Sequence, residues 1–267
     1  MPSILKAAIL GVIQGLTEFL PVSSTAHLLI SSRLIGYDDP GGVFTVMIQL
    51  GSIVAVMWLY REKILAVVAG LPSQPEARRF ALMIVLATIP LLVAGALFSN
   101  YVQRVLYGKF AIIALAFIIG GIIMLVVERM RPVPDVMTVD DLPTGRAVAI
   151  GAFQALALVP GVSRSGGTIV AAMAMRVDRA AAAEFTFFLA MPAMSAAFAK
   201  GLLDVRHDLA SARALEIAVG FVMAFIASAA VVKPFLAVVR RSGFGPFAWY
   251  RIVLGLAMLA AIAAGWQ

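Results

Sequence analysis

The sequence predicts an all-α polytopic membrane protein with about six transmembrane helices and two re-entrant helical hairpins. Of its 267 residues, 62% are hydrophobic and only 13% are charged, and the mean hydropathy is +1.00. A soluble domain is about 45–50% apolar and about 25% charged. This composition therefore excludes a soluble single-domain enzyme and a disordered chain. The third observation is a series of apolar segments separated by short loops.

The apolar segments lie at 4–20, 24–35, 43–60, 80–98, 110–127, 146–159, 165–175, 181–199, 215–232 and 248–266. Crossing the hydrocarbon core takes roughly 20 apolar residues, so the six segments from 43–60 to 110–127 and from 181–199 to 248–266 are predicted to span. Segment 4–20 contains polar Gln14, Thr17 and Glu18 and precedes no small-residue cleavage site, so it is expected to be mature structure rather than a signal peptide.

The four remaining segments are short and form two pairs, each broken by a proline and a serine-rich stretch. The first break is Pro21–Thr25 and the second is Pro160–Gly167. Irregular backbone at membrane depth is tolerated only where protein or a water-filled cavity covers it. Each pair is therefore predicted to be a re-entrant hairpin rather than two separate spans.

The two breaks are related by a shift of 140 residues. The identical pairs are Gly11 and Gly151, Gln14 and Gln154, Leu16 and Leu156, Val22 and Val162, and Ser23 and Ser163. Chance similarity between apolar segments is one explanation; we favour a duplication because the shift also superimposes the two hairpins. The 267 residues then form one integral membrane domain, with a first repeat at 1–130 and a second at 146–267.

Each repeat would hold one hairpin and three spans, so the second repeat must be inverted relative to the first, as in many transporters. The hairpin tips would then meet near the midplane. Basic residues favour the cytoplasmic side. One predicted side carries twelve of them and the other carries seven, so the side with twelve is expected to be cytoplasmic and both termini external. The twelve are Arg61, Lys63, Arg78, Arg79, Arg129, Arg131, Arg146, Arg176, Arg179, Lys233, Arg240 and Arg241.

The net charge of +7 is thereby explained by membrane orientation, and no nucleic-acid partner is expected. The chain has no cysteine, which excludes disulfides, thiolate metal sites and cysteine nucleophiles. The expected partners are the lipid bilayer and a lipid substrate. The sequence leaves the oligomeric state open, a homodimer included.

Ionisable groups inside a membrane are costly, and each is a candidate for function. Glu18 lies in the first hairpin, His27 follows the first break, and Arg164 lies in the second break. Gln14 and Glu18 are four residues apart and share one face of a helix. Their oxygens could hold a hard cation such as Mg²⁺ or Ca²⁺. The alternatives are that Gln14 only bonds a neighbouring helix and that Glu18 only pairs with Arg164.

The second break has the composition of an anion site. Glycine lets the backbone approach a ligand, and a helix beginning here would offer free N–H groups and a positive dipole end. Arg164 adds a planar donor fork that suits phosphate. The candidate phosphate-binding residues are Gly161, Ser163, Ser165, Gly166, Gly167, Thr168 and, in the last span, Arg251. Close helix packing is an alternative explanation of the glycines and serines, but not of the arginine.

The first break carries a candidate nucleophile and base. A hydroxyl beside a histidine can attack with the histidine as base, or the histidine can attack phosphorus itself. Ser24 and His27 are the candidates here; Ser23 and Thr25 more simply satisfy backbone groups freed by Pro21. The catalytic set is therefore Glu18, Ser24, His27 and Arg164.

Two contiguous motifs carry a resemblance. Residues 11–27, GVIQGLTEFLPVSSTAH, resemble the first signature of the undecaprenyl-diphosphate phosphatase family of the bacitracin-resistance type, and residues 160–168, PGVSRSGGT, resemble its second. The Tyr250-Arg251 pair is similar to a further family feature. Gln14 takes a place where the family has Glu or Gln, and a neutral ligand would hold a metal more weakly.

The resemblance implies a cation-dependent integral membrane phosphatase of the bacterial plasma membrane, with its site facing the periplasm or cell exterior. It would convert undecaprenyl diphosphate to the monophosphate carrier lipid used in cell-wall synthesis. The rival hypothesis is a transporter of polyprenyl-phosphate lipids, because inverted repeats with broken helices are a transporter design.

Overall fold

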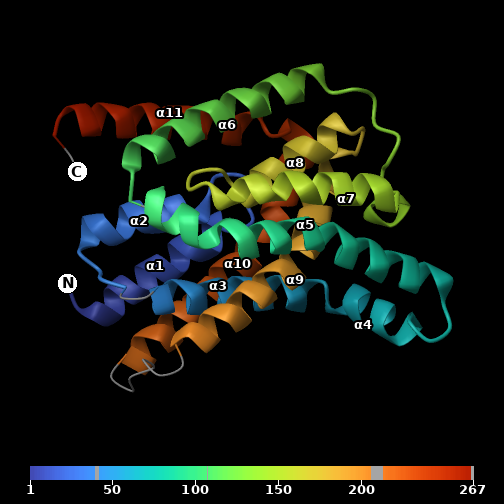
Figure 1. Cartoon of the computed structure of the whole chain (residues 1–267), viewed down its shortest axis with the longest axis horizontal. Helices are drawn as coiled ribbons and strands as arrows, with labels where there is room; N and C mark the ends of the chain where they lie inside the picture. The colour runs from blue at the N-terminus through green and yellow to red at the C-terminus, as the bar shows by residue number, and fades with distance from the viewer. Residues whose placement is uncertain (40–41, 107, 206–212, 266–267) are drawn as a thin grey trace.

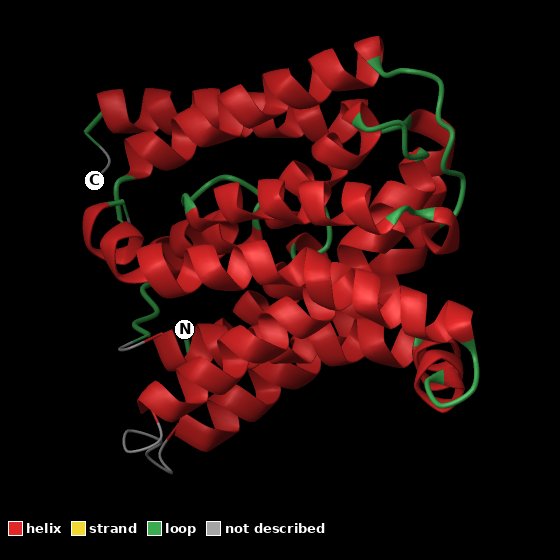
Figure 2. Ribbon diagram, turned by 45° about the vertical axis from the view of Figure 1, so that its right-hand side comes forward, coloured by secondary structure: helices red, strands yellow, loops and turns green. Residues whose placement is uncertain are grey.

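The computed structural model describes residues 1–39, 42–106, 108–205 and 213–265, and most of these residues are helical. Figure 2 shows helices joined by short loops. Within the described ranges, the one isolated extended pairing is a parallel bridge between Val136 and Val177. The predicted all-α class is confirmed.

The helices lie roughly along one axis, with both termini at the same end of the molecule (Figure 1). In chain order they are α1 (Ser3–Thr17), α2 (Ser24–Ile35), α3 (Val43–Leu59), α4 (Arg61–Gly70), α5 (Pro75–Val105), α6 (Phe110–Met130), α7 (Thr144–Phe153), α8 (Arg164–Ala174), α9 (Arg179–Val205), α10 (Ala214–Ser242) and α11 (Gly245–Ala263). Two 3₁₀ turns, η2 (Val139–Asp141) and η3 (Gln154–Leu158), flank α7.

Five helices of the described chain are long and apolar enough to cross a membrane. They are Pro75–Ser99 of α5, α6, Arg179–Lys200 of α9, α10 and α11. A sixth candidate is the pair of α3 and α4, which is bent by 72°. The prediction of about six spans is therefore confirmed, with one of the six a bent pair.

The first and second hairpins are the pairs α1–α2 and α7–α8. Helix α1 has 15 residues, which gives about 22 Å of helix against a hydrocarbon core of about 30 Å. In Figure 1, α1 and α2 lie toward the end that holds the termini, and α7 and α8 lie toward the opposite end. The two turns meet between these ends, where the Ser165 hydroxyl donates to the Leu20 carbonyl at 2.7 Å.

Each hairpin packs against a long helix from the other half of the chain: α1 contacts α10, and α7 contacts α5. A Cβ on Gly11 would lie 2.3 Å from the Gly220 carbonyl oxygen, and one on Gly151 would lie 1.9 Å from that of Ala87. Only glycine allows such close backbone approach. The two glycines occupy equivalent places under the shift of 140 residues. The duplication and its boundaries stay predictions, and this reciprocal packing supports them.

Aromatic packing in the core fixes the position of the first turn. Phe19, which is fully buried, packs edge-to-face on Phe187 of α9 with 5.4 Å between ring centroids. Such aromatic pairs contribute about 0.5–1.5 kcal/mol beyond simple burial. Because Phe19 follows Glu18 directly, this contact also limits where the carboxylate can lie.

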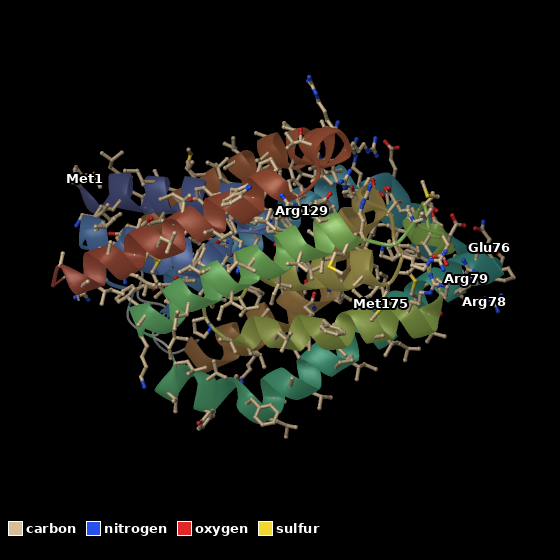
Figure 3. All side chains as sticks on the ribbon, turned by 90° about the horizontal axis from the view of Figure 1, so that it is seen from above. Met1, Glu76, Arg78, Arg79, Arg129 and Met175 are labelled. Atoms are coloured by element: carbon tan, nitrogen blue, oxygen red, sulfur yellow. The ribbon has the colours of Figure 1, made fainter. Side chains whose placement is uncertain are left out.

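The end of the molecule opposite Met1 carries Arg78 and Arg79 (Figure 3). The linker between the two halves is held there by ion pairs of Asp135 with Arg146 and of Asp140 with Lys63, both at 2.5 Å. The hydrogen bond from Arg146 holds the pKa of the Asp135 carboxyl below its usual range. The predicted orientation, with this basic end cytoplasmic, is not tested by these contacts.

Candidate active site

The carboxylate of Glu18 lies at the centre of the candidate site. It follows the last residue of α1 and is 6% exposed. Its Oε2 accepts hydrogen bonds from Gln14 Nε2 at 2.7 Å and from Ser24 Oγ at 2.5 Å. Its Oε1 accepts from Arg164 Nη2 at 3.0 Å. The structure thus brings together four predicted site residues from both hairpins.

The pair formed by Glu18 and Arg164 is largely buried, with side-chain exposures of 5% and 14%. Removing one partner of such a pair leaves an uncompensated buried charge, which costs about 3–5 kcal/mol. Arg164 is the first residue of α8, so its positive charge lies at the positive end of the helix dipole. Its Nη1 has no hydrogen-bond partner within the described chain. A bound phosphate oxygen would satisfy this buried donor.

The oxygens beside Glu18 fit a hard cation. Gln14 is fully buried, and its amide nitrogen donates to Glu18 while its Oε1 has no partner among the described groups. A buried carbonyl oxygen without a donor is costly, and Mg²⁺ and Ca²⁺ prefer oxygen ligands. No cluster of three or more His, Cys, Asp or Glu able to hold a metal is found in the described ranges. Substrate phosphate and water would have to complete the coordination.

Ser24 is the first residue of α2, and its hydroxyl contacts Glu18. The residue before it, Ser23, has φ 67°, a left-handed conformation that is uncommon for a residue with a side chain. The described contacts of Ser24 therefore favour Glu18 as its base, whereas the sequence also allowed His27 in that role.

His27 has both ring nitrogens engaged. Nδ1 lies 2.8 Å from the Ser23 carbonyl oxygen, and Nε2 lies 2.7 Å from the Tyr250 hydroxyl. A carbonyl only accepts, so Nδ1 carries the ring proton. The Phe117 ring packs against the imidazole with 5.8 Å between centroids. Tyr250 was not among the predicted site residues; its place beside Arg251 in the resembling pair was the available signal.

The hydroxyls of the second break are turned inward. Ser163 accepts from the Gly166 N–H at 3.1 Å, which caps α8. Ser163 and Ser165 hydroxyls lie 2.9 Å apart. Since Ser165 donates to Leu20, Ser163 must be the donor in this contact. Thr168 donates to the Arg164 carbonyl at 2.9 Å. All three hydroxyls are buried. Ser165 joins the two turns, whereas Ser163 and Thr168 bond groups of the second hairpin. Contact of these hydroxyls with phosphate stays a prediction.

The glycines of this break differ in their surroundings. Gly161 has φ 90°, and a Cβ there would lie 2.8 Å from the Ile113 carbonyl oxygen, so it is needed for close packing on α6. A Cβ on Gly166 would approach Ser163 at 3.1 Å, whereas at Gly167 the nearest atom would be 3.7 Å away. Gly167 therefore has the most free space of the three.

Arg251 is 2% exposed and binds main chain. Its Nη1 donates to the Pro21 carbonyl at 3.1 Å, and its Nη2 donates to Gly161 at 3.1 Å and to Ala116 at 3.0 Å. One guanidinium thus connects the first turn, the second turn and α6. The predicted contact of Arg251 with phosphate is not tested; the contacts present give it a positioning role.

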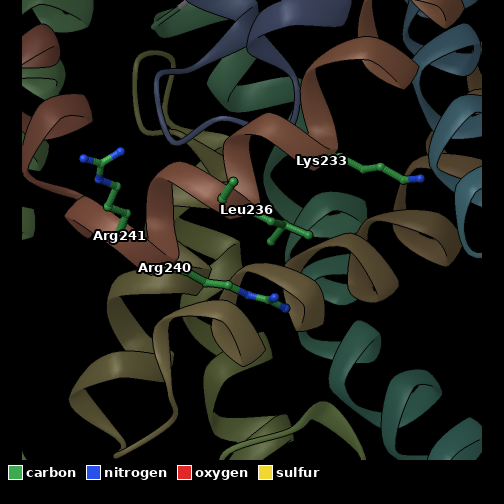
Figure 4. Close-up of a pocket in the computed structure, with 5 residues that line it drawn as sticks. Lys233, Leu236, Arg240 and Arg241 are labelled. Carbon is green, nitrogen blue, oxygen red and sulfur yellow. The ribbon is translucent and has the colours of Figure 1, made fainter.

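A hollow of about 550 Å³ lies elsewhere, along the C-terminal half of α10 (Figure 4). It is lined by Lys233, Leu236, Ala237, Arg240 and Arg241. None of the predicted site residues lines it, and its cations belong to the basic end of the molecule.

The fold and these contacts define an integral membrane protein with a buried, charged site where two hairpin turns meet. The chain belongs to the family described as bacitracin resistance protein BacA, whose model matches residues 7–257. It is 46% identical to "Undecaprenyl-diphosphatase 1" of Agrobacterium fabrum over 260 residues, 97% of each chain. It is also 46% identical to "Undecaprenyl-diphosphatase" of Caulobacter sp. over 265 residues, 98% of each chain. The predicted family is confirmed.

Proposed function

We propose that this chain is an undecaprenyl-diphosphatase, which hydrolyses undecaprenyl diphosphate to undecaprenyl phosphate and inorganic phosphate. Family membership and relatives of that name, similar over nearly the whole chain, support the activity. In the structure, the observation that carries it is the Ser24 hydroxyl bound to a buried carboxylate that also pairs with Arg164. This arrangement supplies a nucleophile, a base and an anion-binding donor in one place.

In the proposed first step, Ser24 Oγ attacks the terminal phosphorus and Glu18 takes the hydroxyl proton. The bond between that phosphorus and the bridging oxygen breaks, and the lipid monophosphate leaves with the oxygen. Water then attacks the serine phosphate, releasing inorganic phosphate and restoring Ser24. Arg164 stabilises charge on the transferring group, and such positioning and electrostatics supply most of the catalysis in phosphoryl transfer.

Attack by His27 on phosphorus is the alternative that the sequence left open. Ser24 is favoured because its Oγ lies 2.5 Å from Oε2 of Glu18 and donates to it, whereas Nε2 of His27 is occupied by the Tyr250 hydroxyl. We therefore assign His27 to proton exchange at Nε2 rather than to attack on phosphorus.

A divalent cation, Mg²⁺ or Ca²⁺, is proposed as the cofactor. The Glu18 carboxylate and the unpartnered Gln14 Oε1 would hold it, and the diphosphate would supply further oxygens. When bound, such an ion neutralises phosphate charge.

The protein is a multi-pass membrane protein of a bacterial family. We place the site toward the periplasm or cell exterior, as the resemblance to the undecaprenyl-diphosphate phosphatase family implies, with the basic loops on the cytoplasmic side. Attachment of a membrane-impermeant maleimide to single cysteines in this cysteine-free chain would test that orientation.

The test of the function is phosphate release from undecaprenyl diphosphate by detergent-purified protein, with and without EDTA. We expect release that EDTA abolishes and Mg²⁺ or Ca²⁺ restores. Glu18→Gln should lose activity by at least about a hundredfold. Glu76 is an exposed carboxylate at the end of the molecule opposite Met1 (Figure 3), so Glu76→Gln should retain activity.

Phosphate release that EDTA does not reduce would show that Gln14 and Glu18 hold no essential cation, and it would leave the proposed phosphatase activity standing. The absence of release from folded, lipid-binding protein would overturn the phosphatase and favour the lipid transporter.

A further inference from the structure

The hydroxyl of Tyr250 forms the outer contact of His27. Tyr250 lies on α11 and is 47% exposed, whereas its hydroxyl is 2.7 Å from His27 Nε2. The two rings are nearly parallel, with 10° between their planes and 5.7 Å between centroids. Tyr250 is thus half-exposed on α11 while its hydroxyl and ring contact the imidazole.

The contacts on the two ring nitrogens define a single neutral tautomer. The Ser23 carbonyl requires a proton on Nδ1, so neutral Nε2 presents a lone pair, to which the Tyr250 hydroxyl donates. When Nε2 gains a proton, the same phenol oxygen can accept it in a hydrogen bond. The contact therefore persists in both protonation states, as required of a group that guides proton exchange.

The neighbouring residue on α11 supports this placement of Tyr250. Arg251, the next residue on α11, binds the Pro21 and Gly161 carbonyls, and it is buried whereas Tyr250 is half-exposed. The start of α11 is thereby anchored to both hairpin turns. Opposite Tyr250, the Phe117 ring of α6 contacts the imidazole. His27 is confined between two helices that pack on one another, α6 and α11.

We propose that Tyr250 is a positioning residue for the reaction: its hydroxyl holds the His27 imidazole in place, donating to neutral Nε2 and accepting from Nε2 once that atom is protonated. This rests on the proposed function, in which His27 exchanges a proton at Nε2. A purely structural tyrosine would need only its ring, whereas this role needs the hydroxyl.

The test compares Tyr250→Phe, which keeps the ring and removes the hydroxyl, with Trp249→Phe. Trp249 is 59% exposed and precedes Tyr250 on the same helix, so it is a matched control. We expect Tyr250→Phe to lower kcat about tenfold, the effect of one lost hydrogen bond, with little change in KM and an altered pH profile. Trp249→Phe should match the parent in all three.

The second readout is the state of the imidazole itself. The chain has two histidines, so a His207→Gln background leaves His27 as the single source of imidazole signals in a ¹H–¹⁵N NMR spectrum. We expect the Nδ1–H tautomer in both proteins, because the Ser23 carbonyl sets it, and a shifted Nε2 signal in Tyr250→Phe, because the hydroxyl that donates to Nε2 is lost.

An unchanged kcat and pH profile in Tyr250→Phe would overturn the proposal. A lower kcat with an unchanged Nε2 signal would also overturn it, because the hydroxyl would then act on something other than the imidazole. Failure of the proposed function is distinguished by His27→Ala: full activity in that variant removes His27 from the mechanism, whatever Tyr250 does.

Discussion

The two hairpin turns have serines at equivalent sequence positions, but these serines have different roles. Ser23 and Ser163 occupy the same place under the shift of 140 residues, and each precedes a helix. Ser163 has φ −68° and its hydroxyl caps α8. Ser23 has φ 67°, makes no side-chain cap, and points its carbonyl at His27. The same residue type therefore stabilises a helix in one turn and orients a catalytic candidate in the other.

The neighbouring positions diverge in charge. Where the first turn has Glu18 and Ser24, the second has Leu158 and Arg164. The carboxylate and the guanidinium then meet at 3.0 Å across the pseudo-equivalent turns. The comparison teaches that the reactive groups are concentrated in the first turn, while the second supplies one cation and a rigid support.

The largest expected loss of activity tests this difference between the two turns. Ser24→Ala should lower phosphate release by about a thousandfold or more, because it removes the proposed nucleophile. Ser163→Ala removes a helix cap worth about 1 kcal/mol and should lower activity no more than about tenfold. Steady-state phosphate release and thermal unfolding of both variants check this. Equal losses of activity would show that the second turn shares the chemistry.

Arg164 is the charged residue of the second turn that is expected to act on the substrate. Arg164→Ala should lower activity about 10²–10³-fold and, by leaving Glu18 buried and unpaired, destabilise the fold by about 3–5 kcal/mol. Arg164→Lys restores charge without the planar fork, so it should recover stability more than rate. Urea-dependent unfolding beside kinetics separates the two effects. Phosphate release that survives Arg164→Ala nearly intact would contradict the site assignment.

A smaller effect concerns the cation. Gln14→Glu replaces a neutral oxygen ligand with a carboxylate and should lower the Mg²⁺ or Ca²⁺ concentration for half-maximal activity by roughly tenfold. Without added cation, two adjacent carboxylates should make this variant less stable than the parent, because like charges repel. A cation titration of activity and of melting temperature tests both. An unchanged half-maximal concentration would place the cation away from Gln14.

Much of the site could be predicted from sequence because charged groups in an apolar chain are rare. Glu18, His27 and Arg164 stood out on that ground, and the structure brings Glu18 and Arg164 into contact. The partners of the hydroxyls could not be predicted. Ser163, Ser165 and Thr168 have the composition of a phosphate site, yet their hydroxyls bond protein groups here, because which way a side chain turns depends on the helices packed around it.

The sequence by itself determined the all-α membrane class, the number of spans, the two hairpins and the family, since these depend on segment length, apolar composition and contiguous motifs. Only the tertiary structure decided that Arg251 connects both turns and that Tyr250 reaches His27 across 223 positions of the chain. The physical reason is that such contacts depend on how α11 packs on its neighbours. That packing involves residues far apart in sequence, and no local pattern in the sequence records it.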